Sequence, residues 1–166
     1  NRIVNALRGL GLAKGDRIAF LSRNSHIYIE GILSAARGGF VLTTLNFLLK
    51  PDEVSYILRH CGAQIIFFQP EFAEVVDAIR SSCPELKYFI SLGGPVDFAW
   101  DYSPFFADAS DKEPPVVVYG DDLLLLVYTS GTTGQPKGVA LNHQNVCTNV
   151  IDSARGVELS DETLNL

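Results

Sequence analysis

The residues best suited to chemistry stand together at 128–138, in the stretch YTSGTTGQPKG that follows the apolar run LLLLV. Its three glycines allow tight turns and close approach of the backbone to a bulky anion. The hydroxyl side chains supply hydrogen-bond donors, and Lys137 supplies one mobile positive charge suited to a phosphate. Because each hydrogen bond to a charged oxygen contributes about 1.5 to 3 kcal/mol, several together would hold a triphosphate. The stretch therefore predicts a polyphosphate-binding loop.

A purely structural interpretation of this loop stays open, because glycine- and threonine-rich segments are common surface connections. The stretch is also not the Walker pattern GxxxxGK[ST]. Two residues separate Gly131 from Gly134, and Gly138 follows the lysine. A nucleotide-binding hypothesis therefore requires a different family of proteins.

The composition is that of a folded globular chain. Its 166 residues are about the size of one domain, with 47% hydrophobic and 19% charged residues. The net charge of -6 argues against a general nucleic-acid binder, which needs a basic face. Three cysteines without CxxC spacing suggest neither a disulfide framework nor a zinc site. The absence of a long apolar run excludes an integral membrane segment, and we expect a cytoplasmic protein.

Apolar segments and amphipathic segments alternate along the chain. Strands are expected at 17–21, 40–45, 64–68, 87–91 and 123–128, with a shorter one at 139–141. Helices are expected at 3–10, 25–36, 51–61 and 70–82, and from 143 after a cap at Asn142. Continuous apolar strands between helices predict an α/β fold, a parallel sheet with helices on both faces. The stretch 92–120 is expected to be a long irregular connection pinned to a surface.

Ligands of such sheets bind at the carboxyl edge of the strands, where the 128–138 loop is expected to lie. TSGTTGQPKG strongly resembles the phosphate-binding signature of the AMP-forming acyl-CoA synthetases, the adenylation domains of nonribosomal peptide synthetases and the luciferases. NALRGLGLAKGDRIAFLSRNS, SAARGGFVLTTLNFLLKPDEVSYILRHCGAQIIF and LNHQNV are similar to neighbouring regions of that family. The chain departs from the family pattern at Thr44, Lys50 and Asn142, all outside the loop.

The resemblance implies that a carboxylic acid, fatty or aryl, is activated with ATP to an acyl-adenylate and then transferred to coenzyme A. It also implies that Lys137 is catalytic and neutralises the departing pyrophosphate. The residues implied to line the ATP phosphates are Thr129, Ser130, Gly131, Thr132, Thr133, Gly134 and Lys137. By the same pattern, Thr129 would help to place Mg²⁺.

The resemblance further implies that residues 1–166 are one partial domain, the N-terminal portion of the large AMP-binding domain, without the small C-terminal domain. Such a piece is expected to be inactive alone and to self-associate through exposed strand edges. Two other functions stay open: an amino-acid adenylation domain of a nonribosomal peptide synthetase, and a non-catalytic phosphate-binding module.

Several other residues have structural roles as their simplest interpretation. His143 is expected to be a packed or solvated first-turn residue, Cys147 a core residue, and Asp121-Asp122 a solvated loop end. His26 and His60 have no partner nearby in the sequence and are interpreted as structural. The aromatic residues Trp100, Tyr102, Phe105 and Phe106 are expected to pack the long connection.

Overall fold

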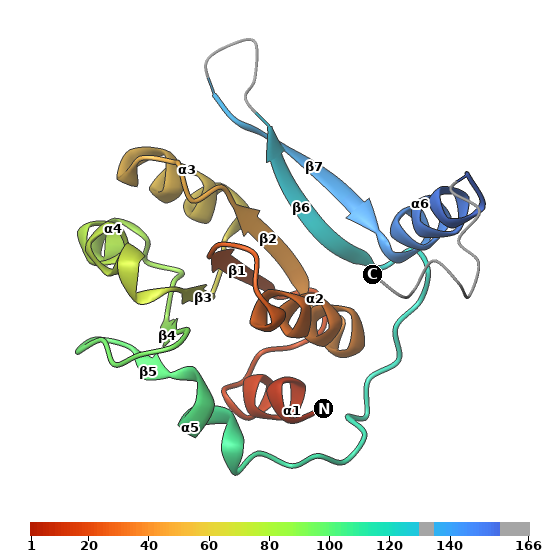
Figure 1. Ribbon diagram of the computed structural model, residues 1–166, viewed down its shortest axis with the longest axis horizontal. Coiled ribbons are helices and arrows are strands. Elements are labelled where there is room, and N and C mark those ends of the chain that lie inside the picture. The colour runs from red at the N-terminus through yellow and green to blue at the C-terminus, as the bar shows by residue number, and fades with distance from the viewer. Residues whose placement is uncertain (130–134, 157–166) are drawn as a thin grey trace.

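A computed structural model describes residues 1–129 and 135–156 of the chain. The described residues form a seven-stranded sheet in the order β5-β4-β3-β1-β2-β6-β7 (Figure 1). The strands are β1 Arg17–Leu21, β2 Val41–Leu45, β3 Ile65–Phe68, β4 Tyr88–Ser91, β5 Trp100–Asp101, β6 Leu123–Thr129 and β7 Lys137–Asn142. Strand β1 is central, since it lies in the middle of this order between β3 and β2.

The predicted parallel sheet is confirmed for β1 to β6, whose neighbouring pairs all run parallel. Strand β7 differs, because it pairs antiparallel with β6 and forms a hairpin. A parallel return would need a crossover of a dozen or more residues. The connection 130–136 is shorter than that, so β7 must run back along β6.

All helices except α5 lie close to their predicted positions. The helices are α1 Arg2–Gly9, α2 His26–Gly38, α3 Pro51–Cys61, α4 Ala73–Ile79, α5 Tyr102–Ala107 and α6 His143–Gly156, with 3-10 turns at Pro70–Phe72 and Arg80–Ser82. The Ser25 side chain accepts a hydrogen bond from the Tyr28 N–H and caps α2, which ends before the left-handed Gly39. The capping and glycine signals in the sequence therefore mark this helix correctly.

Helices cover both faces of the sheet, as predicted, and each face has its own core. Alternate side chains of β1 belong to different cores: Ile18 and Phe20 pack with residues of α1, α2 and α5. Ala19 and Leu21 pack on the other side with residues of α3 and α4. Strands β1, β2 and β3 are almost completely buried on both faces, which explains their continuous apolar sequences.

The connection 92–120 contains two short elements, β5 and α5, that the sequence pattern did not predict. The connection is pinned to the surface, as expected. The side chain of Asn5 donates to the carbonyls of Ser110 and Lys112, and Lys14 donates to the Val117 carbonyl. The aromatic residues pack the connection as predicted: Trp100 stacks on Phe105, and Phe106 enters the core beside α1 and α2.

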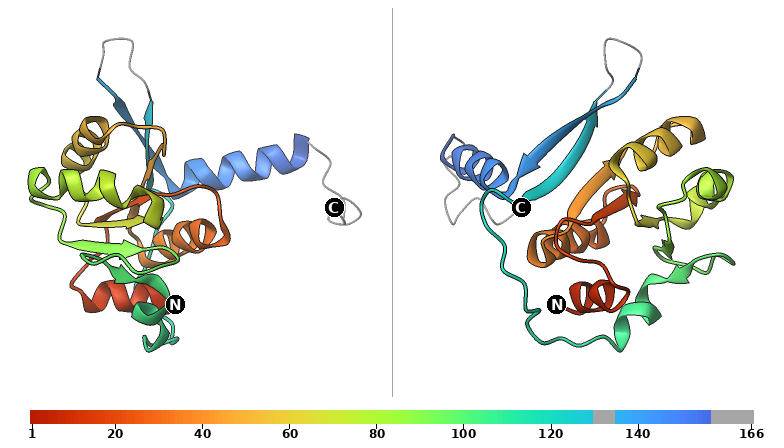
Figure 2. Two further views of the ribbon diagram at one scale, coloured as in Figure 1. Left: turned by 60° about the vertical axis from the view of Figure 1, so that its left-hand side comes forward. Right: turned by 180° about the vertical axis from the view of Figure 1, so that it is seen from behind.

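Helix α6 extends away from the sheet (Figure 2). None of its residues is buried, and Val150 and Ile151 are exposed. The prediction that Cys147 is a core residue is wrong, because its side chain is exposed. The spacing of Val146, Val150 and Ile151 suggested that one face of the helix is buried, but of these three only Val146 packs against a core. Self-association through such surfaces stays a prediction.

No helix in the described part of the chain is long and apolar enough to cross a membrane.

Candidate functional site

The β6–β7 hairpin brings the two ends of the predicted phosphate loop together. Thr129 is paired with Lys137 across the hairpin, and Tyr128 with Gly138. Side chains that are directly opposite in an antiparallel pair lie on the same face of the sheet. The hydroxyl of Thr129 and the ammonium of Lys137 therefore share one face, and both residues are exposed. The other predicted phosphate ligands, Ser130, Gly131, Thr132, Thr133 and Gly134, lie outside the described residues.

Tyr128 has a role that the sequence did not reveal. Its side chain lies on the opposite face from Thr129, because successive strand residues alternate. Its hydroxyl Oη is 2.6 Å from Nδ1 of His60 on α3, and the two rings meet edge to face. Either atom supplies the proton, depending on the imidazole tautomer. Burial raises the pKa of the Tyr128 phenol to about 12, with smaller contributions from Cys61 and Tyr56.

His60, expected to be a structural residue without a partner, thus contacts the strand that leads into the loop. His60 and Tyr128 are 68 positions apart in the sequence. The one local signal is that Tyr56 and His60 are four residues apart on a helix, where side chains are neighbours. Their rings do stack, with centroids 5.7 Å apart. Nothing in the sequence indicates that β6 passes this pair.

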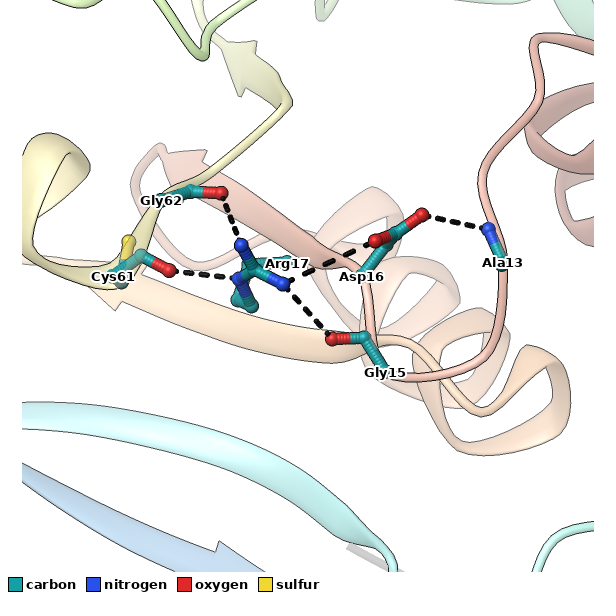
Figure 3. Close-up of polar contacts among 6 residues, drawn as sticks. All are labelled: Ala13, Gly15, Asp16, Arg17, Cys61 and Gly62. Atoms are coloured by element: carbon teal, nitrogen blue, oxygen red, sulfur yellow. Dashed lines mark hydrogen bonds and ion pairs between the residues drawn. The ribbon is translucent and has the colours of Figure 1, made fainter.

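Helix α3 is itself held by Arg17, at the start of the central strand β1 (Figure 3). The Arg17 guanidinium donates through Nε to the Cys61 carbonyl at 2.7 Å and through Nη2 to the Gly62 carbonyl at 2.9 Å. These carbonyls lie at the end of the helix, where they lack intrahelical donors. Arg17 therefore fixes the end of α3 that carries His60.

The opposite end of the hairpin is anchored through Asp122. Its carboxylate Oδ2 lies 2.5 Å from Nζ of Lys14 and accepts the Tyr119 N–H at 2.6 Å. The hydrogen bond from Lys14, followed by that from the Tyr119 N–H, lowers the pKa of this carboxyl below its usual value. The expectation of a solvated loop end holds for the exposed Asp121, whereas Asp122 is only partly exposed and is engaged in these contacts. The sequence could not show this, because Lys14 belongs to a distant turn.

The first turn of α6 completes this anchor. The prediction that Asn142 caps α6 is confirmed, since its Oδ1 accepts the Asn145 N–H at 2.8 Å. Asn145 returns the contact by accepting the Asn142 N–H. The His143 N–H donates to the Asp122 carbonyl. His143 is partly exposed in the first turn of α6, in agreement with the expected packed or solvated first-turn residue.

Comparison with known proteins identifies the family. The AMP-binding enzyme family matches residues 1–165. A fatty acid–[acyl-carrier-protein] ligase, ScoC of Streptomyces coeruleorubidus, is 38% identical over 146 residues, which are 87% of this chain and 27% of the relative. A feruloyl-CoA synthase of an Amycolatopsis species is 36% identical over 154 residues, which are 90% of this chain and 28% of the relative.

Solved structures agree with the sequence relatives. The anthranilate CoA ligase AuaEII, solved with anthranoyl-AMP, superposes with a TM-score of 0.83 at 30% identity. The match covers 87% of this chain and 28% of AuaEII. The chain thus spans little more than a quarter of the length of these relatives. From its loop signature, its fold and these matches, the chain belongs to the AMP-binding enzyme family.

Proposed function

We propose that the complete protein uses ATP to activate a carboxylic acid, forming an acyl-adenylate and pyrophosphate, and then transfers the acyl group to coenzyme A. The observation that carries the proposal is the pairing of Thr129 with Lys137 at the two ends of the TSGTTGQPKG loop. The relatives' names, a fatty-acid ligase, a feruloyl-CoA synthase and an anthranilate CoA ligase, support a fatty or aryl acid as the substrate. The reaction is expected in the cytoplasm, where ATP and coenzyme A are available.

The first half-reaction brings two anions together, because a carboxylate attacks the α-phosphorus of ATP. Positive charge and donors arranged around the polyphosphate reduce this repulsion and stabilise the charge that develops on the leaving pyrophosphate. Lys137 would supply the charge. The hydroxyls of Thr129, Ser130, Thr132 and Thr133 and the backbone N–H groups of Gly131 and Gly134 would supply the donors.

Magnesium fits the same end of the hairpin. Mg²⁺ takes oxygen ligands and is usually held together with substrate phosphates. The hydroxyl of the exposed residue Thr129, next to the proposed phosphate position, would supply one protein oxygen. The ion, when bound with the nucleotide, would neutralise further phosphate charge.

The test is carboxylate-dependent exchange of labelled pyrophosphate into ATP by the complete protein, with a panel of fatty and aryl acids. The substitution Lys137→Ala is expected to lower the rate of pyrophosphate exchange about 100- to 1,000-fold. Enzymes lose about this much when one hydrogen-bond donor to a developing negative charge is removed. Lys87→Ala is the matched control. Lys87 is also exposed, but it precedes β4 at the amino edge of the sheet. Equal rates in the two variants would contradict the proposed role of Lys137.

An acyl-carrier protein is a second candidate acceptor, because the relative ScoC is a fatty acid–[acyl-carrier-protein] ligase. Coenzyme A and a carrier protein bearing a phosphopantetheine thiol should be supplied in parallel reactions. Thioester formation on one acceptor alone assigns the second half-reaction. Exchange supported by amino acids alone would favour an amino-acid adenylation domain. No exchange with any acid would favour a phosphate-binding module.

A further inference from the structure

The contact between Tyr128 and His60 lies next to both ends of the phosphate loop, yet the proposed chemistry uses neither side chain. Tyr128 directly precedes Thr129 in the chain. Across the hairpin it is opposite Gly138, which directly follows Lys137. The Tyr128 ring also covers Gly138, since a β-carbon built there would lie 3.1 Å from the ring carbon Cζ. A constraint on Tyr128 is therefore a constraint on the backbone of both proposed phosphate-binding residues.

We propose that Tyr128 and His60 form a positioning pair that holds Thr129 and Lys137 in place for the polyphosphate. This inference rests on the proposed function for its ligand. Neither residue of the pair touches the nucleotide in this proposal, because Tyr128 occupies the opposite face of the hairpin from Thr129 and Lys137. The pair acts through the backbone of β6 and β7.

The support behind His60 makes the pair effective. Val54, Ile57 and Leu58 of α3 are buried in the core that the helix shares with α4 and the sheet. The end of α3 is tied to β1 through the two carbonyl contacts of Arg17. His60 also stacks on Tyr56, which restricts the rotation of its ring. The hydrogen bond thus connects the end of β6 to a fixed point on the central sheet.

The size of the effect follows from the strength of one neutral hydrogen bond, which corresponds to about a two- to tenfold change in an equilibrium. Lys137 and Thr129 would hold the phosphates both before and during the reaction. Looser positioning is therefore expected to raise KM for ATP about two- to tenfold, with a smaller change in kcat. A general loss of folded protein would instead lower the apparent kcat and leave KM unchanged.

The experiment compares four variants of the complete protein in pyrophosphate exchange. Tyr128→Phe removes the hydroxyl and keeps the ring. His60→Phe removes Nδ1 and keeps the stacking on Tyr56. Both are expected to raise KM for ATP by similar factors, and the double variant should be no worse than either. His60→Asn is expected to restore the wild-type KM, because the amide of asparagine reaches about the position of Nδ1.

Backbone hydrogen exchange supplies a readout that does not depend on activity. In Tyr128→Phe, the amides of Thr129 and Lys137 are expected to exchange about two- to tenfold faster, while those of Leu125 and Leu141 stay unchanged. Wild-type exchange at Thr129 and Lys137 in this variant overturns the inference, as does a His60→Asn variant that behaves like His60→Phe.

The two proposals fail in different ways. In one case, the amides of Thr129 and Lys137 exchange faster in Tyr128→Phe, but Lys137→Ala keeps the wild-type rate of pyrophosphate exchange. This result would support the positioning contact and contradict the proposed role of Lys137. In the other case, Lys137→Ala loses pyrophosphate exchange, but Tyr128→Phe keeps the wild-type KM for ATP. This result would contradict the positioning pair and leave the proposed function unaffected.

Discussion

The two ends of the β6–β7 hairpin are built differently. At the base, where β6 begins and β7 ends, Asp122 contacts Lys14 and the Tyr119 N–H, and Asn142 and Asn145 exchange hydrogen bonds. At the tip, where β6 ends and β7 begins, the described residues make one side-chain hydrogen bond, between Tyr128 and His60. The two residues at the tip that would face a ligand, Thr129 and Lys137, are both exposed.

This difference is what we expect if the base attaches the hairpin to the sheet and the tip binds a ligand. The elements that bind ligands are drawn from the less stable parts of a fold, because they must rearrange around the ligand. A base with many contacts keeps the hairpin attached to the sheet. A tip with one specific contact leaves the proposed phosphate-binding residues accessible while limiting where they lie.

The largest expected difference between base and tip concerns apolar packing. Leu124 at the base is 4% exposed and belongs to the core beside α1 and α2, whereas Val139 near the tip is 44% exposed. Leu124→Ala should lower the free energy of unfolding by about 2 to 5 kcal/mol. Val139→Ala should lower it by less than about 1 kcal/mol. Native-state hydrogen exchange of the β6 amides measures both, and equal losses would remove the proposed contrast.

A smaller effect is expected from two glycines at the two ends. A β-carbon at Gly138 would lie 3.1 Å from Tyr128 Cζ, whereas one at Gly120 would make an ordinary contact of 3.6 Å with Gln144. In Gly138→Ala, the overpacking is expected to cost about 1 to 3 kcal/mol. This cost should exceed the roughly 0.5 to 1 kcal/mol that a strand gains when alanine replaces glycine. Gly120→Ala should be neutral or stabilising by up to about 1 kcal/mol.

The readouts for this glycine pair are amide exchange along the hairpin and KM for ATP. Faster exchange at Thr129 and a raised KM are expected in Gly138→Ala only. A Gly138→Ala variant as stable as Gly120→Ala would show that the Tyr128 ring moves aside freely, which would weaken the case for a fixed position of Tyr128.

The smallest expected effect is a difference in pH dependence. The lowered pKa of Asp122 means that its contribution to stability is present above the unfolded value of 3.8 and is lost as the pH falls through the folded value. The pKa of Tyr128 is raised to about 12, so its contribution is present below pH 10.0 and is lost as the pH rises through about 12. Acid therefore weakens the base of the hairpin, and alkali weakens the tip.

Two titrations check this contrast. Carboxyl NMR of labelled aspartate should show a pKa of Asp122 below the usual value of 3.8, and Lys14→Ala should bring its pKa closer to that value. The difference in tyrosinate absorbance between wild type and Tyr128→Phe should show a phenol that ionises near pH 12. A Tyr128 phenol that ionises near pH 10 would mean that it is open to water.

Much of the fold could be predicted because its signals are local. Apolar runs marked the strands at 17–21 and 64–68, Ser25 marked the start of α2, and Asn142 marked the start of α6. The family signature TSGTTGQPKG could also be recognised, because its residues are consecutive. Cys147 was misplaced for the same reason, since a helical period shows which residues share a face but not whether that face is covered.

The amino-acid sequence is enough to predict the alternation of strands and helices, the likeness to the AMP-binding family and the residues at both ends of the loop. The folded chain was needed to show that β1 lies between β2 and β3, that β7 runs antiparallel, and that His60 contacts Tyr128. The two levels differ because they depend on interactions of different range. Propensity, capping and periodicity act between neighbours in the chain, whereas the partners of Asp122 and Tyr128 are set by how the helices pack on the sheet.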